Sequence, residues 1–233
     1  MNGRIIAVVG ATGGCGASLL AGGVALALAR AGRPVWLVDL DLERGDLAGG
    51  WDLAPERSLD DLAPVADELG SEHLRRAAAV HRSGVSVLAA PGRPGAAGRW
   101  NAGRVRALLA SIAREGDVVA DAASGGVVGQ SAVASAGSVL FACPATVAGV
   151  RRGVRRLEGW RERDLDERIG VVALRTATPE LSTRALGRAL GVAVLAEVPW
   201  SRSEAADLAM GAWPRRGRRR LASALDRVAE VLP

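Results

Sequence analysis

The sequence contains no lysine and no tyrosine, and its 233 residues include only one phenylalanine and two cysteines. All 30 basic side chains are therefore arginine, so any role that needs a permanent positive charge falls to arginine. The two cysteines, Cys15 and Cys143, suggest neither a disulfide framework nor a metal-ligand set. This composition argues against a disulfide-rich secreted domain and favours a reducing, cytoplasmic setting.

Signals for export or membrane insertion are also missing from the pattern. No charged segment, apolar segment and cleavage site precede the first strand-like run. The longest apolar stretch, residues 19–29, is too short and too rich in glycine and alanine to span a bilayer. With 49% apolar residues the chain can bury a sizeable core, and a net charge of +5 permits an anionic partner without requiring one.

Short apolar runs alternate with helical patterns along the chain. We expect strands at 4–9, 35–40, 85–90, 117–122, 138–143, 169–174 and 192–199. We expect helices near 17–31, 72–82, 102–114, 147–165, 180–190 and 217–232. Most of the strand-like runs are continuously apolar, as in parallel strands buried on both faces. The pattern predicts one α/β domain over residues 1–233, with a doubly wound, mostly parallel sheet flanked by helices.

The stretch 10-GATGGCGASLL-20 lies between the first predicted strand and the first predicted helix. Its glycines allow backbone N–H groups to converge on a phosphate, and the helix N-terminus adds a positive dipole. Ser18 has the position of a hydroxyl group that binds Mg²⁺. The candidate nucleotide-binding residues are Gly13, Gly14, Cys15, Gly16, Ala17, Ser18 and Leu19.

Three aspartates lie where two other predicted strands end. Asp39 and Asp41 close the second strand, and Asp121 closes the fourth. Each alone is compatible with an ordinary strand-end acid, but ligands of open parallel sheets bind beyond the carboxyl ends of the strands. Together with the loop they predict a magnesium-nucleotide site. We expect Ser18, Asp39 and Asp121 to be the metal ligands and Asp41 to be the catalytic candidate of a vestigial site.

Four segments together resemble the MinD/ParA superfamily of deviant-Walker P-loop ATPases over nearly the whole chain. They are 12-TGGCGAS-18, 39-DLDLERGDLA-48, the strand ending at Asp121, and 192-VAVLAEVPWSRSEAADLAMGAWP-214. Within the superfamily the lysine-free loop and residues 39–48 are most similar to CpaE and TadZ, the positioning proteins of tight-adherence (Tad, type IVb) pilus systems. The resemblance implies a P-loop fold, a homodimer, and a site for ATP or ADP with Mg²⁺.

The chain departs from the family pattern at the residues that carry charge or recognise the base. Thr12 and Ala17 replace the two loop lysines, and 172-VALRT-176 lacks the asparagine that commonly recognises adenine. Arg4, Arg44 and Arg202 are the nearest candidates to supply the lost charge. Phosphoryl transfer depends on preorganised positive charge, so we expect weak or absent nucleotide binding and negligible hydrolysis.

Three functions remain as hypotheses. The first is a non-catalytic scaffold that positions pilus or secretion proteins in the cytoplasm, at a cell pole or at the membrane-bound machine. The second is an active ATPase switch in which an arginine replaces lysine. The third is a partition or septum-site protein that binds DNA or an acidic membrane. CpaE-type proteins often carry an N-terminal receiver-like domain, so this chain is either a piece that begins at the ATPase-like domain or a stand-alone member.

Two arginine clusters could serve the third function. They are Arg151, Arg152, Arg155 and Arg156, and Arg215, Arg216, Arg218, Arg219 and Arg220. A solvated helix face is the simpler interpretation, and an anionic surface site is the alternative. Residues 218–232 predict a one-faced helix, for which we favour core packing over a membrane anchor.

Overall fold

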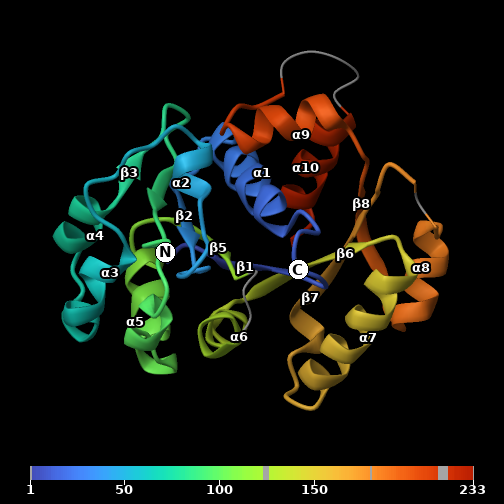
Figure 1. Ribbon diagram of the computed structural model, residues 1–233, viewed down its shortest axis with the longest axis horizontal. Coiled ribbons are helices and arrows are strands. Elements are labelled where there is room, and N and C mark those ends of the chain that lie inside the picture. Colours follow the sequence, from blue (N-terminus) through green and yellow to red (C-terminus); the bar gives the residue numbers. More distant parts are fainter. Residues whose placement is uncertain (1, 123–125, 179, 215–219, 233) are drawn as a thin grey trace.

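The computed structural model describes residues 2–122, 126–178, 180–214 and 220–232. An eight-stranded sheet has the order β3-β4-β2-β5-β1-β6-β7-β8, and its pairs are parallel except for β3 against β4 (Figure 1). The strands are β1 (Ile5–Gly10), β2 (Val35–Asp39), β3 (Ala79–Val80), β4 (Ser86–Leu88), β5 (Asp117–Asp121), β6 (Ser138–Pro144), β7 (Ile169–Leu174) and β8 (Val194–Val198). The predicted doubly wound α/β fold is confirmed.

Helices cover both faces of this sheet (Figure 1). The α-helices are α1 (Ala17–Arg30), α2 (Leu47–Gly50), α3 (Leu59–Leu62), α4 (Ser71–Ala77), α5 (Ala102–Ala113), α6 (Gly126–Ser135), α7 (Val147–Arg161), α8 (Thr183–Leu190), α9 (Arg202–Ala209) and α10 (Arg220–Glu230). Short 3₁₀ turns occupy η1 (Ala63–Glu68), η2 (Ala96–Arg99) and η3 (Asp166–Arg168).

The alternation of side chains along the central strand separates two apolar layers. In β1, Ile6 and Val8 pack with the layer that contains α1 and α10. Ala7 and Val9 pack with the opposite layer, which contains α5, α6 and α7. Successive side chains of a strand point to opposite faces, so a continuously apolar strand is buried on both. The helices of the two layers therefore meet the carboxyl edge of the sheet from opposite sides.

The helix predicted near residues 72–82 is correct only for its first half. Helix α4 ends at Ala77, and β3 then pairs antiparallel with β4. A tight turn causes the reversal, because His81 N donates to Val85 O at 2.9 Å and Gly84 has φ of +86°. Helices α6 and α9 were not predicted. Apart from Gln130, residues 126–135 are apolar or small on all sides, so they carry no one-faced pattern.

The C-terminal helix α10 packs its apolar face into the protein. Leu221, Leu225 and Val228 are buried in the layer that contains α1. Buried Glu204 of α9 accepts hydrogen bonds from Leu221 N at 3.1 Å and Ala222 N at 3.2 Å, which satisfies the start of α10. The prediction of core packing is confirmed. Within the described residues, no helix combines the length and the apolar character that a membrane span requires.

Helix α7 begins at a defined point beside β6. Thr146 Oγ1 accepts a hydrogen bond from Gly149 N at 3.0 Å, which caps the helix. A Cβ atom on Gly149 would lie 2.3 Å from Pro144 O, so glycine allows α7 to approach the end of β6. This contact sets how far the α7 arginines lie from the carboxyl edge of the sheet.

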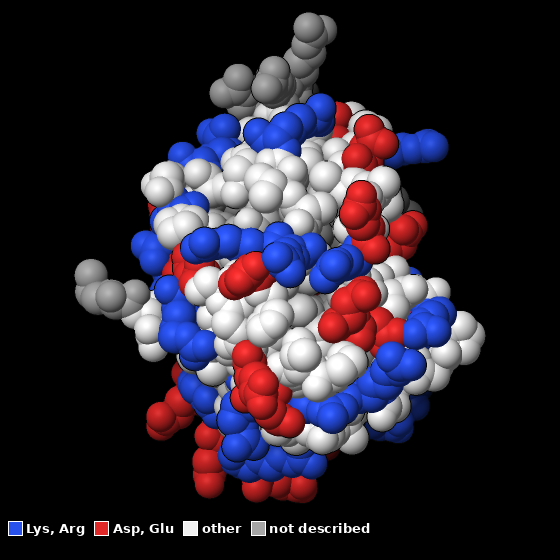
Figure 2. All heavy atoms as spheres, turned by 90° about the vertical axis from the view of Figure 1, so that its left-hand side faces the viewer, with Lys and Arg blue, Asp and Glu red and all other residues white. Residues whose placement is uncertain are grey.

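The side of the molecule that bears α3, α4 and β3 carries charges of both signs. Figure 2 faces the side that bears α3, α4 and β3 in Figure 1, and arginines alternate there with acidic side chains. The ion pairs agree, since Arg75 pairs with Glu115 at 2.9 Å and Arg76 with Glu72 at 2.7 Å. Interspersed charges of both signs suit a solvated surface.

Candidate functional site

The glycine-rich loop joins β1 to α1 at the carboxyl edge of the sheet. Gly14 and Gly16 have φ of +70° and +99°, which L side chains rarely adopt. Gly16 is the N-cap of α1 and supplies no side-chain acceptor, and the first turn of α1 contains no acidic residue. The first N–H groups of α1 are therefore available to an external anion.

Open space lies above this loop. A Cβ atom built on Gly13 or Gly14 would meet no atom of the described residues within 4 Å. Cys15 turns toward β6, where its Sγ donates to Ala142 O at 3.8 Å. Burial raises the pKa of the neighbouring Cys143 thiol to about 12, so that thiol stays protonated and acts as a core side chain.

Three predicted acids and Ser18 line one cavity of about 320 Å³, here called the acid pocket. Ser18 comes from the first turn of α1, and Asp39 and Asp121 come from the ends of β2 and β5. Asp39 stands directly opposite Asp121 in the parallel register of these strands. Asp41 also lines the pocket, and its Oδ1 lies 4.0 Å from Arg44 Nε. The structure thus brings the predicted metal-site residues together.

Asp39 carries an unusual electrostatic load. Burial, together with the negative charges of Asp121 and Asp41, raises the pKa of its carboxyl group to about 7. Backbone hydrogen bonds from Leu47 N at 3.2 Å and Asp41 N at 3.1 Å oppose the shift. A cation placed beside Asp39 and Asp121 would relieve this repulsion and favour the ionised form.

Residues 40–47 wrap around the Asp39 carboxylate and fix it in place. A Cβ atom on Gly45 would lie 2.3 Å from Asp39 Oδ1, so only glycine fits at this point of the wrap. Gly45 N donates to Asp41 O at 2.6 Å and closes the turn. The segment 39-DLDLERGDLA-48 therefore encodes the position of one carboxylate through one glycine and two backbone N–H donors.

The ligand set of the acid pocket fits Mg²⁺ that is shared with a phosphate. Magnesium in nucleotide sites binds one or two carboxylates and completes its shell with water and phosphate oxygens. Across the described part of the chain, no three His, Cys, Asp or Glu residues converge to hold a metal by themselves. Ser18, Asp39 and Asp121 would hold the ion, which would supply positive charge to the phosphates of a bound nucleotide.

An apolar cavity of about 360 Å³ lies on the other side of the start of α1, and we call it the base pocket. Leu19 and Leu208 line both this cavity and the acid pocket, so the two adjoin. The base pocket is lined by loop residues 12 and 14–16, the ends of β7 and β8, and exposed Trp200. Thr176 Oγ1 lines it as a buried atom without a hydrogen-bond partner among the described residues. An apolar slot beside a phosphate loop suits a nucleotide base.

Solved structures share this whole arrangement of elements. A ParA family ATPase from Chlorobium tepidum aligns with a TM-score of 0.87 and 19% identity, covering 98% of each chain. The cell division ATPase MinD of Pyrococcus furiosus gives a TM-score of 0.82 at 21% identity, covering 98% of this chain and 97% of that one. The chain has the fold of the MinD and ParA ATPases.

A third similar structure contains a ligand in its published form. The septum site-determining protein MinD of Pyrococcus horikoshii, complexed with Mg-ADP, gives a TM-score of 0.81 at 19% identity and covers 97% of this chain and 94% of that one. Neither a protein-family model nor a curated protein sequence matches the chain. The MinD/ParA fold therefore rests on the three-dimensional likeness.

The arginines predicted to replace the loop lysines are not equally placed for that role. Arg4 lies at the opposite, amino edge of the sheet, where its Nη2 is 3.2 Å from Asp117 Oδ2. Arg202 begins α9 and lines neither the acid pocket nor the base pocket. Arg44 does line the acid pocket, but its side chain is 79% exposed and faces Asp41. The expectation for Arg4 is wrong, because Asp117 holds it away from the loop.

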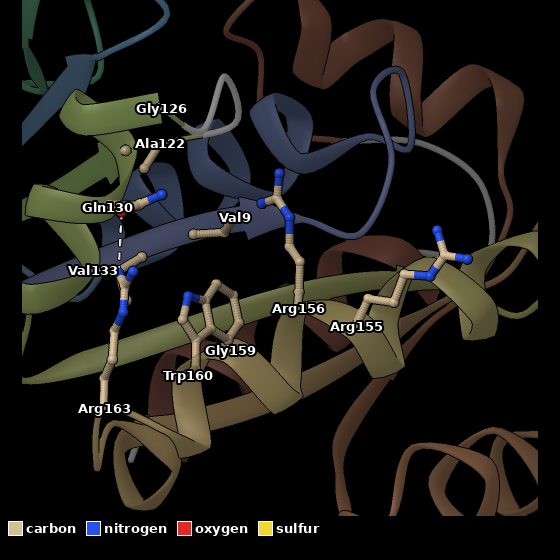
Figure 3. Close-up of a pocket in the computed structure, with 11 residues that line it drawn as sticks. Val9, Ala122, Gly126, Gln130, Val133, Arg155, Arg156, Gly159, Trp160 and Arg163 are labelled. Atoms are coloured by element: carbon tan, nitrogen blue, oxygen red, sulfur yellow. Dashed lines mark hydrogen bonds between the residues drawn. The ribbon is translucent and has the colours of Figure 1, made fainter.

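A third cavity, of about 210 Å³, lies between α6 and α7 (Figure 3). We call it the α6–α7 pocket. Val9 and Ala122, at the ends of β1 and β5, form its floor on the sheet face opposite α1. In Figure 3, Arg156 extends from α7 toward Val9 at the start of the phosphate loop, whereas Arg155 points away. No sequence pattern separates Arg156 from its exposed neighbours.

The two predicted arginine clusters differ in what can be said of them. Arg151, Arg152 and Arg155 are exposed on α7, while Arg156 is half-buried. Of the second cluster, Arg215, Arg216, Arg218 and Arg219 lie outside the described residues, and Arg220 is exposed at the start of α10. The interpretation of the first cluster as one solvated face is therefore wrong for Arg156.

Proposed function

We propose that this protein is a positioning scaffold of the MinD/ParA type that binds nucleotide weakly at most and hydrolyses it negligibly. One observation carries the proposal: the phosphate loop keeps its backbone geometry while Thr12 and Ala17 stand where lysines would supply charge. The acid pocket and the base pocket retain the shape of a nucleotide site. Losing charge at a preserved site reduces catalysis more than binding, because the transition state depends on that charge.

The finer assignment is to the CpaE/TadZ branch, which positions Tad pilus or secretion proteins. It is supported by the lysine-free loop and by the wrap of residues 39–48 around Asp39. On this proposal the protein acts as a homodimer in the cytoplasm or at the membrane-bound machine, and its partners are pilus or secretion assembly proteins. ADP with Mg²⁺, the ligand of the Pyrococcus horikoshii MinD structure, is the first nucleotide to test.

Calorimetric titration with ATP·Mg²⁺ and ADP·Mg²⁺, with native mass measurement in parallel, tests binding and dimer formation. Loss of one charge-assisted hydrogen bond is worth about 1.5–3 kcal/mol, which weakens binding by about one to two decades. We expect dissociation constants near or above the millimolar range and a dimer population that changes little with nucleotide. Micromolar affinity together with nucleotide-driven dimer formation would contradict the proposal.

Gly14→Ala, with Gly84→Ala as its matched control, tests whether the loop is the binding element. Both glycines have positive φ, +70° and +86°, and a Cβ atom on either would meet nothing within 4 Å. The two variants should lose similar stability, about 1 kcal/mol each. Only Gly14→Ala should weaken whatever nucleotide binding the wild type shows, because its Cβ atom projects into the open space above the loop. Equal binding by the two variants would place the ligand elsewhere.

Ala17→Lys tests the assignment of lost chemistry. The new lysine restores a cation at the loop, and Ala17→Met provides a side chain of similar length without charge. We expect Ala17→Lys alone to tighten ATP binding and to raise turnover above the wild-type background. A wild type that already hydrolyses ATP at a rate typical of MinD or ParA enzymes would instead support the ATPase switch.

A second candidate function is binding to DNA or an acidic membrane. Exposed Arg151, Arg152 and Arg155 form no ion pair with any carboxylate in the described ranges, which favours an anionic surface partner. Such binding should weaken steeply with salt, because each neutralised phosphate releases counterions. The test is binding to duplex DNA and to phosphatidylserine vesicles at 50 mM salt, where the screening length is about 14 Å. If neither binds, this function is excluded.

A further inference from the structure

The α6–α7 pocket presents hydrogen-bond donors from its side chains. Three arginines line it, Arg155, Arg156 and Arg163, together with Gln130 of α6 and Trp160 of α7. Arginine is permanently protonated and has no acceptor, and the indole N–H of tryptophan is a donor only. No carboxylate belongs to its lining within the described residues. The remaining lining side chains are apolar or absent, as at Val9, Val133 and Gly159.

Gln130 is oriented so that its donor faces the cavity. Its Oε1 accepts a hydrogen bond from Arg163 Nη1 at 3.0 Å, so the amide oxygen is turned toward Arg163. In Figure 3 the amide nitrogen consequently points toward Val9 and Arg156. Trp160 is held by an edge-to-face contact with Phe141, with ring centroids 5.2 Å apart and an angle of 82°. One wall of the pocket is thus the buried ring of Trp160, and the other is the pair of exposed side chains Gln130 and Arg163.

Arg156 is the least compensated charge of this group. It is half-buried, and none of the described carboxylates forms an ion pair with it. Burial lowers the pKa of its guanidinium group, while the nearby Cys15 of the phosphate loop raises it. The guanidinium stays charged, no carboxylate of the described residues offsets its desolvation, and a bound anion would do so. By contrast, Arg4 and Arg33 at the far edge both reach Asp117.

We propose that the α6–α7 pocket is an oxyanion site that binds a phosphoryl group through Arg156, the Gln130 amide and Arg163. A phosphoryl group fits better than a carboxylate for two reasons. Two guanidinium groups, those of Arg156 and Arg163, lie on different sides of the pocket (Figure 3), which suits a tetrahedral anion with more than one negative charge. The floor of the pocket is Val9, which directly precedes the glycine-rich phosphate loop. The volume of about 210 Å³ is several times the share of one water molecule, about 30 Å³.

The phosphoryl group can come from two sources. It is either inorganic phosphate or the terminal phosphate of a nucleoside triphosphate seated on the loop. The second source rests on the proposed nucleotide site, and the first does not. In the second case α7 supplies the cation that the loop lacks, from a different element of the fold.

The test uses Arg156→Gln with Arg151→Gln as the matched control. Arg151 is an exposed arginine of the same helix that does not line the α6–α7 pocket. Calorimetric titrations with inorganic phosphate and pyrophosphate at constant ionic strength give the first affinities. We expect Arg156→Gln to weaken phosphate binding at least about tenfold. Arg151→Gln should change it less than about twofold, because it loses only a screened, exposed charge. Trp160 fluorescence, with Trp160→Phe as the signal control, reports occupancy of the pocket itself.

Titrations with ATP·Mg²⁺ and ADP·Mg²⁺ distinguish the two sources. If the ligand is the terminal phosphate, Arg156→Gln weakens ATP binding at least about tenfold and leaves ADP binding unchanged. If the ligand is free phosphate, wild type binds it equally with and without ADP·Mg²⁺. If no nucleotide binds, the phosphate titrations of wild type, Arg156→Gln and Arg151→Gln still test the proposed oxyanion site. The inference is overturned if Arg156→Gln and Arg151→Gln have equal effects on every anion, or if no phosphate, pyrophosphate or ATP saturates the Trp160 signal.

Discussion

At the amino edge of the sheet, Asp117 is surrounded by Arg4 and Arg33, whereas at the carboxyl edge Asp39 lies opposite Asp121. Asp117 and Asp121 are the two ends of the same strand, β5. At one end the chain neutralises its own carboxylate, and at the other it places carboxylates beside each other while Arg156 lies in a separate pocket across the sheet. Charge that is satisfied within the chain holds the fold together, and charge that is kept apart is available to ligands.

The largest expected effect belongs to the amino edge. Burial raises the pKa of the Asp117 carboxyl group, but hydrogen bonds from Arg33 and Arg4 outweigh it and leave the pKa below its ordinary value. The contacts include Arg33 Nη2 at 3.0 Å and Arg4 N at 2.9 Å from Oδ1. Asp117→Asn should lower the free energy of unfolding at pH 7 by about 3 kcal/mol, as for loss of charge-assisted hydrogen bonds. Urea denaturation measures it.

The pH dependence of that loss follows from the direction of the shift. A carboxylate with a lowered folded-state pKa stabilises the protein above its unfolded pKa, near 4, and the contribution disappears as pH falls through the lower folded value. The difference between wild type and Asp117→Asn should therefore shrink below about pH 4. A difference that stays constant from pH 7 to pH 3 would show that packing, rather than charge, fixes this edge.

Asp39→Asn should raise the free energy of unfolding at pH 8, which is the opposite of the effect expected for Asp117→Asn. The folded-state pKa of about 7 lies above the unfolded value, so the folded protein binds the extra proton and stability falls as pH rises from about 4 to about 7. A shift of about three units corresponds to about 4 kcal/mol. One backbone N–H loses its acceptor in the variant, which destabilises the variant by about 2 kcal/mol and reduces the gain by that amount. At pH 8 without Mg²⁺, we expect Asp39→Asn to be more stable than wild type by about 2 kcal/mol.

Urea denaturation at pH 5 and pH 8, each with and without 10 mM Mg²⁺, checks this prediction. The gain should vanish at about pH 5 and become a loss toward pH 4, where only the missing hydrogen-bond acceptor still distinguishes the variant. Mg²⁺ should stabilise wild type but not the variant, since a ligand of the folded state stabilises by mass action. If Asp39→Asn is destabilised at pH 8 to the same extent as Asp117→Asn, the two edges do not differ in kind.

At the carboxyl edge, the sequence predicts which residues gather but not how the strands pair. The loop with Ser18, Asp39 and Asp121 were predicted together because each follows or ends a strand whose apolar run is visible locally. Parallel strands then bring their carboxyl ends to one edge without further information. The register that sets Asp39 against Asp121, and hence the raised pKa of Asp39, is a property of strand pairing and was not predicted.

The α6–α7 pocket was missed for a physical reason. Its donors come from α6 and from the end of α7 with the residues that follow it, and α6 has small or apolar residues on every side except at Gln130. No helical pattern therefore identified Gln130 as a pocket residue. Arg156 was seen, but its spacing from Arg152 placed it on the same helix row as an exposed arginine. Only the packing of α7 against β6 separates the two.

Thr176→Val should stabilise the protein slightly. Thr176 Oγ1 is buried in the wall of the base pocket without a partner among the described residues, and burying an unpaired hydroxyl group is unfavourable. We expect a gain of about 1 kcal/mol in the free energy of unfolding, with weaker binding of any nucleotide whose base or ribose uses this hydroxyl. Thr146→Val is the matched control and should lose about 1 kcal/mol, because Thr146 caps α7. Equal losses in both variants would indicate that Thr176 has a structural partner and is not reserved for a ligand.

The smallest effect is expected at Arg44, the only arginine among the described residues that line the acid pocket. Its contact with Asp41 is 4.0 Å long and its side chain is 79% exposed, so Arg44→Gln should change stability by less than about 0.5 kcal/mol. Phosphate and ATP affinity should also change less than about twofold, because solvent screens the charge. Calorimetry of Arg44→Gln beside Arg156→Gln compares the two directly. An affinity loss at Arg44 that equals the loss at Arg156 would place the phosphate-binding charge in the acid pocket, and the separation of cation and anion sites across the sheet would then be wrong.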